Sequence, residues 1–261
     1  MTTGNRPRPA RGGPSPRRFQ PTSADAAQLA TSLTGAGTGL QAEQFDDRTT
    51  SYLNELIPKP WGHEMRVYSD DLYDVWKLCL HPGQSTSLHC HPRKETALLC
   101  AGGHGQMTLL DRRVEVSEGD INLIGKGVFH GTANTGTTDL HLVEVEVPRN
   151  KLDLVRISDR YGRQGASYET SADRPSAALA PAQLLARSRL RQGAAIDGFQ
   201  FDIQAGHDLL SRREPSLVFA VSLAVAAALA HDIDVLPARR IRTAEPEQLY
   251  LSITRTTTST T

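Results

Sequence analysis

The segment with the strongest chemical signal reads Gly83-Gln-Ser-Thr-Ser-Leu-His-Cys-His-Pro-Arg-Lys-Glu-Thr-Ala-Leu-Leu-Cys-Ala-Gly102. Its two histidines, His89 and His91, are two positions apart, so on a β-strand both imidazoles lie on the same face. The Pro-Arg-Lys sequence that follows predicts a turn. Pairing of strands across this turn can bring Glu95 back toward the histidines. The segment therefore predicts two short strands that carry three potential metal ligands.

A second segment, from Gly119 through Gly127 and His130 to Asn134, contributes the fourth candidate ligand from a distant strand. Three neutral imidazoles and one carboxylate suit a divalent ion of borderline softness, such as Fe, Mn, Ni, Co or Zn. Such a set also leaves coordination positions for water or substrate. The predicted metal ligands are His89, His91, Glu95 and His130, and they leave the identity of the metal open.

The sequence around these segments indicates an all-β domain. From Lys59 onward, short β-rich runs are separated by Gly, Pro, Asp and Asn, which is typical of an antiparallel sandwich or barrel. We expect strands at 74–80, 86–91, 95–100, 106–110, 113–116, 121–124 and 140–147.

Taken in order, the two segments resemble the first and second motifs of the cupin superfamily, which implies a double-stranded β-helix (jelly-roll) barrel with one bound metal. Gly125 stands where the second motif usually has proline. The flanks Lys59-Pro-Trp-Gly62 and Asp153-Leu-Val-Arg-Ile-Ser-Asp-Arg-Tyr-Gly-Arg163 resemble those of the type II mannose-6-phosphate isomerase cupin. That family typically has glutamine at the first ligand position, where this chain has His89, and one more residue before the glutamate.

The isomerase resemblance implies roles for two further residues. Glu144 lies where that family has a glutamate, which makes it the candidate general base. Lys77 lies where that family has a basic residue, which makes it a candidate for substrate binding. Strand alternation places Glu144 and Glu146 on one face, and the sequence leaves open whether this face lines the barrel or meets solvent.

Basic residues near the ends of the motif indicate an anionic substrate. The planar guanidinium groups of Arg156 and Arg163 suit phosphate or carboxylate. The alternative for both arginines is an interdomain salt bridge. Arg93 and Lys94 are expected in a solvated turn rather than in a substrate clamp.

The second half of the chain resembles the first. The run from Asp232 to Arg242 overlays the run from Asp120 to His130 without a gap, and a β-like run follows each. This pattern predicts an internal duplication, a bicupin, whose second barrel is degenerate. Because Arg242 falls where His130 stands, we expect no metal in the second barrel. The alternative is a chance match of two apolar strands.

These observations predict four segments. Residues 1–50 form a mostly disordered arm with a possible short helix between 22 and 40, because the sequence up to about Gln20 is Arg, Pro and Gly with almost nothing apolar. Residues 51–165 form the metal-binding domain and residues 166–255 the degenerate second domain. Residues 256–261 form a disordered tail.

Composition limits the partners. Lys+Arg and Asp+Glu both total 29, so no net charge favours nucleic acid or an anionic membrane. The most apolar run, 217–230, is too short for a helix to span a bilayer core of about 30 Å. Three cysteines without a disulfide framework suit a cytoplasmic location. The expected partner is a small-molecule substrate, and monomer and homodimer both stay open.

Three functions remain as alternatives. The first is metal-dependent isomerase or epimerase-like chemistry on a sugar phosphate or nucleotide sugar, with Glu144 as base. The second is a non-haem iron dioxygenase or biosynthetic tailoring enzyme, because the ligand set leaves open positions for oxygen and substrate. The third is a small-molecule-binding cupin without catalytic activity.

Overall fold

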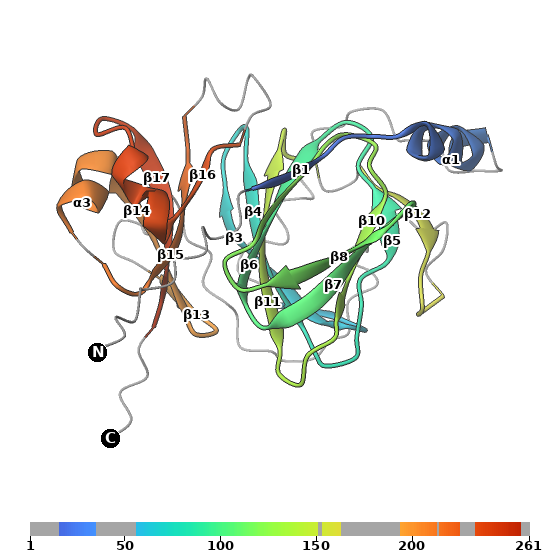
Figure 1. The fold of residues 1–261 in the computed structure, drawn as a ribbon, viewed down its shortest axis with the longest axis horizontal. Helices are drawn as coiled ribbons and strands as arrows, with labels where there is room; N and C mark the ends of the chain where they lie inside the picture. The colour runs from blue at the N-terminus through green and yellow to red at the C-terminus, as the bar shows by residue number, and fades with distance from the viewer. Residues whose placement is uncertain are drawn as a thin grey trace, which may run out of the picture.

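The computed structural model describes residues 16–34, 56–150, 153–162, 194–212, 214–224 and 233–256. These residues are mainly β-strand, which confirms the expected all-β fold (Figure 1). Two sheets form a barrel, and a third sheet packs outside it. No helix among these residues has both the length and the apolar character needed to cross a membrane.

The barrel consists of a seven-stranded and a five-stranded sheet. The larger sheet contains, in spatial order, β1 (Arg17–Phe19), β9 (Ile121–Ile124), β6 (Glu95–Gly102), β11 (Leu140–Val147), β4 (Asp74–Leu80), β3 (Gly62–Ser69) and β2 (Leu56–Lys59). The smaller sheet contains β12 (Val155–Ser158), β5 (Leu88–Cys90), β10 (His130–Asn134), β7 (His104–Leu109) and β8 (Arg113–Ser117).

Side chains alternate between two apolar cores on the two faces of the larger sheet. The inner core fills the barrel with large side chains that include Trp76, Leu98, Met107 and Leu142. The outer core contains the intervening residues of the same strands, such as Val143. Both faces are therefore buried, and the strands read as nearly continuous apolar runs.

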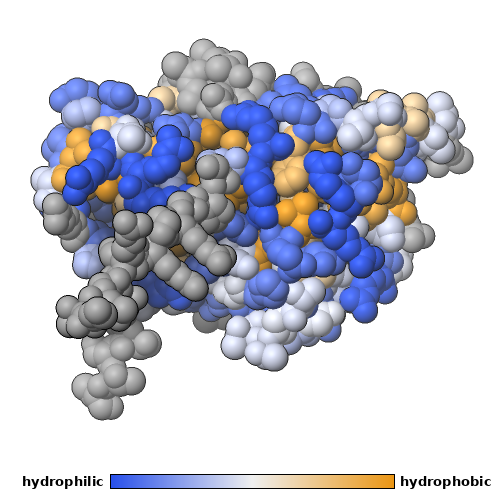
Figure 2. Space-filling model, in the orientation of Figure 1, coloured by the Kyte–Doolittle hydropathy of each residue, from blue (hydrophilic) through white to orange (hydrophobic). Residues whose placement is uncertain are grey.

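The third sheet covers the outer face of the larger barrel sheet. Its spatial order is β13 (Ala194–Ile196), β14 (Phe199–Ala205), β17 (Leu249–Arg255), β15 (Leu217–Ser222) and β16 (Val235–Pro237). In Figure 1 this sheet, orange to red, lies beside the barrel. The view in Figure 2 shows a mainly hydrophilic surface with hydrophobic residues between the polar ones, which agrees with the inward packing of apolar side chains.

The third sheet repeats the connectivity of the barrel. Strands β13, β14, β15, β16 and β17 have the same order in space and in sequence as β3, β4, β6, β9 and β11, and every neighbouring pair is antiparallel in both. This repeat supports the predicted duplication. Because the described part of this half provides one sheet, the second barrel itself stays a prediction.

Short helices stand where the barrel has two strands of its smaller sheet. Between β14 and β15 lies α3 (Gly206–Ser211), at the place that β5 takes in the barrel. Between β16 and β17 lies the 3-10 helix η3 (Ala238–Thr243), at the place of β10. Leu209 and Ile241 of these helices pack on the face of the third sheet that is turned away from the barrel.

The N-terminal segment is ordered from residue 16 to residue 34. Strand β1 pairs in parallel with β9, so the expected disordered arm is wrong for Arg17–Phe19. The expected short helix is present as α1 (Ser23–Thr34). The rest of the predicted arm, like most of the predicted tail, lies outside the described residues.

Strand β1 explains why glycine stands at position 125. The amide of Gly125 donates a hydrogen bond to the carbonyl oxygen of Phe19 over 2.9 Å. Proline has no amide hydrogen and cannot make this bond. A Cβ at this position would also lie only 3.1 Å from the same carbonyl oxygen. The departure from the cupin motif therefore accommodates β1.

Candidate metal centre

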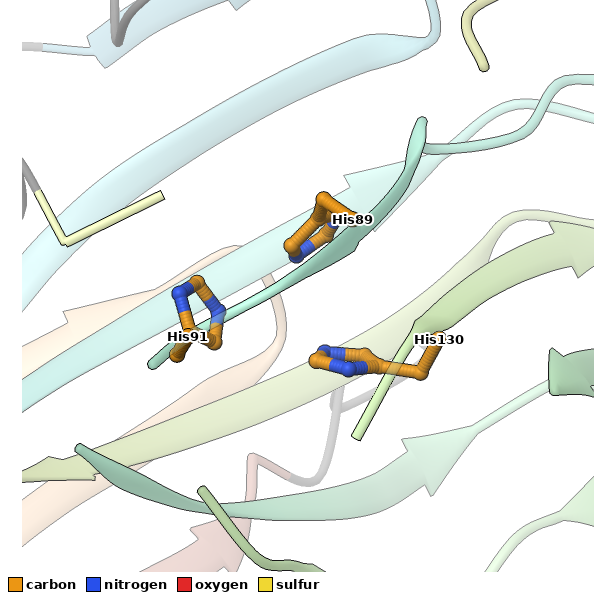
Figure 3. A group of neighbouring side chains, drawn as sticks. All are labelled: His89, His91 and His130. Carbon is orange, nitrogen blue, oxygen red and sulfur yellow. The ribbon is translucent and has the colours of Figure 1, made fainter. Parts of the chain in front are cut away.

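Three histidines converge inside the barrel (Figure 3). His89 lies on β5, His91 follows this strand directly, and His130 begins β10 opposite His89 in register. The ring centroids are 4.9 Å apart for His89 and His91, 4.6 Å for His89 and His130, and 5.5 Å for His91 and His130. Two neighbouring strands thus bring together residues that are far apart in sequence.

Each imidazole is held by a backbone carbonyl group through Nδ1. The acceptors are Ser87 O for His89 at 2.9 Å, Asp153 O for His91 at 2.6 Å and Val128 O for His130 at 3.0 Å. A carbonyl oxygen can only accept, so Nδ1 carries the proton and Nε2 keeps its lone pair. This arrangement orients metal-binding histidines in proteins.

The environment keeps the three rings neutral. Burial lowers the pKa of His89 and of His91 well below the ordinary imidazole value, and it lowers the pKa of His130 to about 4. The buried Nε2 of His91 has no hydrogen-bond partner among the described residues. A buried acceptor that lacks a donor is costly, and a metal ion would satisfy it. The residues present therefore fit a divalent transition metal.

Two carboxylates of β11 complete the surroundings. One carboxylate oxygen each from Glu144 and Glu146 and a ring nitrogen of His91 lie within 4.8 Å of one another. Glu146 also forms a buried ion pair with Lys94, whose Nζ is 2.6 Å from Oε1. The face of β11 that carries both glutamates lines the barrel.

Glu95 does not join the histidines, and its assignment as a ligand needs correction. In the register of β6 and β11, Thr96 lies opposite Glu146, whereas Glu95 lies opposite Val147 on the outer face. Strand β6 already begins at Glu95, so the side chain that points inward beside the turn belongs to Lys94. Glu144 and Glu146 are the carboxylates near the histidines.

Lys94 and Glu146 were not singled out by the sequence motifs. Lys94 is 1% exposed rather than part of a solvated turn. A signal for Glu146 was present, because strand alternation places it on the same face as Glu144. No comparable signal distinguishes Lys94, since a one-residue change in the start of β6 would reverse the faces.

His89 and His91 border an open pocket. Both sequence flanks line it: Lys59 and Trp61 come from the first, and Leu154 and Arg156 from the second. Arg156 lies opposite His89 in register, and its Nε donates to Ser87 Oγ over 3.1 Å. The pocket therefore combines apolar walls with cationic and anionic groups beside the imidazoles.

One predicted substrate-binding residue lies away from this pocket, and another lies outside the part of the chain that the structure describes. Lys77 lies on the outer face of β4, where it forms an ion pair with Asp197. Alternation along β4 turns Trp76 and Leu78 inward and Lys77 outward, so the expectation for Lys77 is wrong. Arg163 lies outside the described residues. Arg156 and Glu144, in contrast, both line the pocket.

Comparisons with known proteins match less than half of this chain. Residues 76–146 match the family model described as "Cupin domain". A mannose-1-phosphate guanylyltransferase from Sinorhizobium fredii is 30% identical over 118 residues, which are 43% of this chain and 23% of that protein. One from Escherichia coli strain K12 is 27% identical over 128 residues, which are 45% of this chain and 25% of that protein.

The chain thus spans about a quarter of the length of these curated relatives. Among solved structures, an uncharacterized conserved protein with a double-stranded beta-helix domain from Klebsiella pneumoniae is 22% identical. The match covers 46% of this chain and 100% of that chain, with a TM-score of 0.35.

Proposed function

Residues 76–146 form a cupin domain, as the two sequence motifs predicted, and we propose that it serves a metal-dependent enzyme acting on a small anionic molecule. The observation that carries this proposal is the convergence of three neutral imidazoles whose Nδ1 atoms are held by backbone carbonyl groups. His89, His91 and His130 would hold the ion, with Glu146 as the nearby carboxylate.

The proposed substrate is a sugar phosphate or a nucleotide sugar. Arg156 and Lys94 place cationic groups beside the imidazoles, and guanidinium and ammonium groups bind phosphate. Trp61 and Leu78 provide apolar walls against which a sugar ring can pack. The similarity to segments of mannose-1-phosphate guanylyltransferases supports the same substrate class.

The proposed reaction is an isomerisation or epimerisation in which a proton moves between adjacent carbon atoms. A divalent ion supplies a Lewis acid that stabilises negative charge on substrate oxygens. Glu144 lines the pocket, is 7% exposed and is the candidate base that accepts the proton. Lys94 holds Glu146 in an ion pair, and the proton-transfer role is assigned to Glu144 because it stands where the isomerase family has a glutamate.

The test is exchange of substrate hydrogen with deuterated solvent under anaerobic conditions. Hexose 6-phosphates and GDP- and UDP-hexoses serve as probes, and mass spectrometry measures deuterium incorporation by the metal-loaded protein. We expect exchange at one carbon, and we expect Glu144→Gln to slow it by about 10²–10⁴-fold. Glu115→Gln, at a side chain that is 61% exposed, is the control and should exchange normally.

Two outcomes would contradict the isomerase proposal. One is the absence of exchange with every probe although the ion is bound. The other is iron-dependent oxygen uptake that is coupled to substrate loss, which would assign the pocket to oxygenase chemistry.

A further inference from the structure

A second group of potential ligands lies outside the pocket, on the outer face of the larger barrel sheet. Cys79 on β4 pairs in register with His63 on β3 and with His141 on β11. Side chains that are directly opposite on neighbouring strands have Cβ atoms about 4.5–5.5 Å apart. Three adjacent strands therefore present an imidazole, a thiol and an imidazole in one row.

A carboxylate from the other half of the chain lies over this row. Asp197 occupies the turn between β13 and β14 with a φ of 54°, a left-handed conformation that aspartate tolerates. Its Oδ2 is 3.4 Å from Nε2 of His63 and 3.8 Å from Nδ1 of His141. The donor atoms of His63, Cys79 and Asp197 all lie within 4.8 Å of one another.

We propose that His63, Cys79, His141 and Asp197 form a second metal site that binds a divalent transition metal, with zinc the best suited. Thiolate, imidazole and carboxylate are the ligands of tetrahedral zinc sites. With one thiolate, bond lengths of about 2.0 Å to nitrogen or oxygen and about 2.3 Å to sulfur place tetrahedral donors roughly 3.3–3.5 Å apart. The distance from Asp197 to His63 falls in this range, whereas His141 and Cys79 would have to move closer to the ion.

Access and protonation suit an ion that enters from solvent. The side chains of His63 and His141 are each 23% exposed and that of Asp197 is 39% exposed, whereas Cys79 is buried. Burial raises the pKa of the Cys79 thiol to about 12, so without an ion this cysteine is an unreactive thiol. A coordinated ion deprotonates the thiol, so binding releases a proton.

Lys77 competes with the ion for this place. Its ammonium group is hydrogen-bonded to Asp197 Oδ2 and lies 3.3 Å from Nδ1 of His141. A metal ion that binds Asp197 and His141 must displace the ammonium group of Lys77. The positive charge of this group also repels the metal ion. Replacement of Lys77 by methionine should therefore tighten metal binding, which a loss of folding cannot imitate.

The site would join the two halves of the chain. Asp197 comes from the second half, whereas His63, Cys79 and His141 come from the barrel. An ion that binds only the folded state stabilises it in proportion to the logarithm of ion concentration over the dissociation constant. The second site is therefore structural in character, and it does not depend on the function proposed for the pocket.

Cobalt(II) distinguishes the two sites, because a thiolate ligand gives a near-ultraviolet charge-transfer absorption and the three-histidine centre contains no thiolate. Full-length protein stripped by chelator is titrated with cobalt(II). We expect a charge-transfer band whose final intensity corresponds to one thiolate-bound cobalt per chain once both sites are filled, and this band should disappear in Cys79→Ala and persist in Cys100→Ala. Absence of the band in the wild type, or its persistence in Cys79→Ala, would overturn the proposal.

Two further variants, His63→Ala and Lys77→Met, test the site even if Cys79→Ala fails to fold. His63→Ala should weaken the cobalt binding that produces the charge-transfer band by at least about tenfold. Even the loss of an outer-shell partner lowers metal affinity by about this factor. His104→Ala, at a side chain that is 51% exposed, is the matched control and should bind normally. Lys77→Met should bind more tightly. Unchanged affinity in both His63→Ala and Lys77→Met would contradict the site.

Discussion

The two halves of the chain share one strand order but differ at the positions where the barrel carries its histidines. In the first half, β5 and β10 belong to the smaller sheet of the barrel and place His89 opposite His130. In the second half, α3 and η3 take these places, and Arg242 lies exposed on η3. The candidate metal centre therefore depends on the smaller sheet, whereas the larger sheet also provides a packing surface.

The comparison explains why the second half can be stable without histidines at these places. Its sheet buries apolar side chains on both faces, against the barrel on one side and against α3 and η3 on the other. The stability of this half thus comes from packing, and its contact with the barrel should be essential to both.

The largest expected effect follows from truncating Phe219, which is fully buried between the third sheet and the barrel. Phe219→Ala should lower the free energy of unfolding by about 3–5 kcal/mol, because it removes a large apolar side chain and leaves a cavity. Urea denaturation measures the change. Leu210→Ala on α3, where the side chain is 38% exposed, should change it by less than about 0.5 kcal/mol.

Separate unfolding transitions for the two halves would contradict this account. A Phe219→Ala protein whose barrel unfolds at the wild-type urea concentration would show that the halves are energetically independent.

A smaller effect is expected where β1 joins the barrel, a strand without a counterpart among the described strands of the third sheet. Gly125→Pro removes the hydrogen bond from Gly125 to Phe19 and should destabilise the protein by about 1–3 kcal/mol. Gly125→Ala adds a side-chain atom but keeps the amide hydrogen. The difference in stability between the two variants therefore reports the effect of losing the hydrogen bond. Equal stability of the two variants would show that the hydrogen bond is unimportant.

The smallest effect concerns the ion pairs that connect the halves in metal-free protein. Hydrogen bonding by His63 and the charge of Lys77 hold the pKa of Asp197 below the ordinary carboxyl value. A lowered folded-state pKa adds stability above the unfolded pKa of about 4, and this stability is lost as pH falls further. Asp197 is 39% exposed, so screening limits the contribution to roughly 0.5–1 kcal/mol.

Chelated Asp197→Asn protein should therefore be less stable than wild type at pH 6, and the difference should vanish as pH falls through the lowered pKa. Unfolding free energies measured along this pH series provide the check. A difference that stays constant down to pH 2 would show that the charge of Asp197 is not responsible.

Short β-rich runs bounded by turn residues were sufficient to predict several strands. The predicted strands at 74–80, 121–124 and 140–147 agree with β4, β9 and β11 at both ends. In contrast, β1 escaped prediction because Arg17–Phe19 stand in an arginine-rich segment, and their pairing with β9 depends on contacts from distant sequence. Spacing likewise identified the three histidines, since each follows from its position in a motif.

The assignment of Glu95 failed for a register reason. The side chains of β6 change face at every residue, so the first paired residue decides whether Lys94 or Glu95 points inward. This pairing is set by β11, where Glu146 lies opposite Thr96. The register cannot be predicted from the sequence of β6 alone. The orientation of Lys77 depended in the same way on which face of β4 met the third sheet.

Metal analysis of His91→Ala tests the central claim most directly. Full-length wild type, His91→Ala and Arg242→Ala are purified without chelator, their folding is checked by thermal unfolding, and their metal content is compared per chain. Because His91 Nε2 points among the other imidazoles, we predict that His91→Ala loses one equivalent of transition metal while Arg242→Ala retains the wild-type content. A folded His91→Ala protein with the full wild-type content would contradict the account.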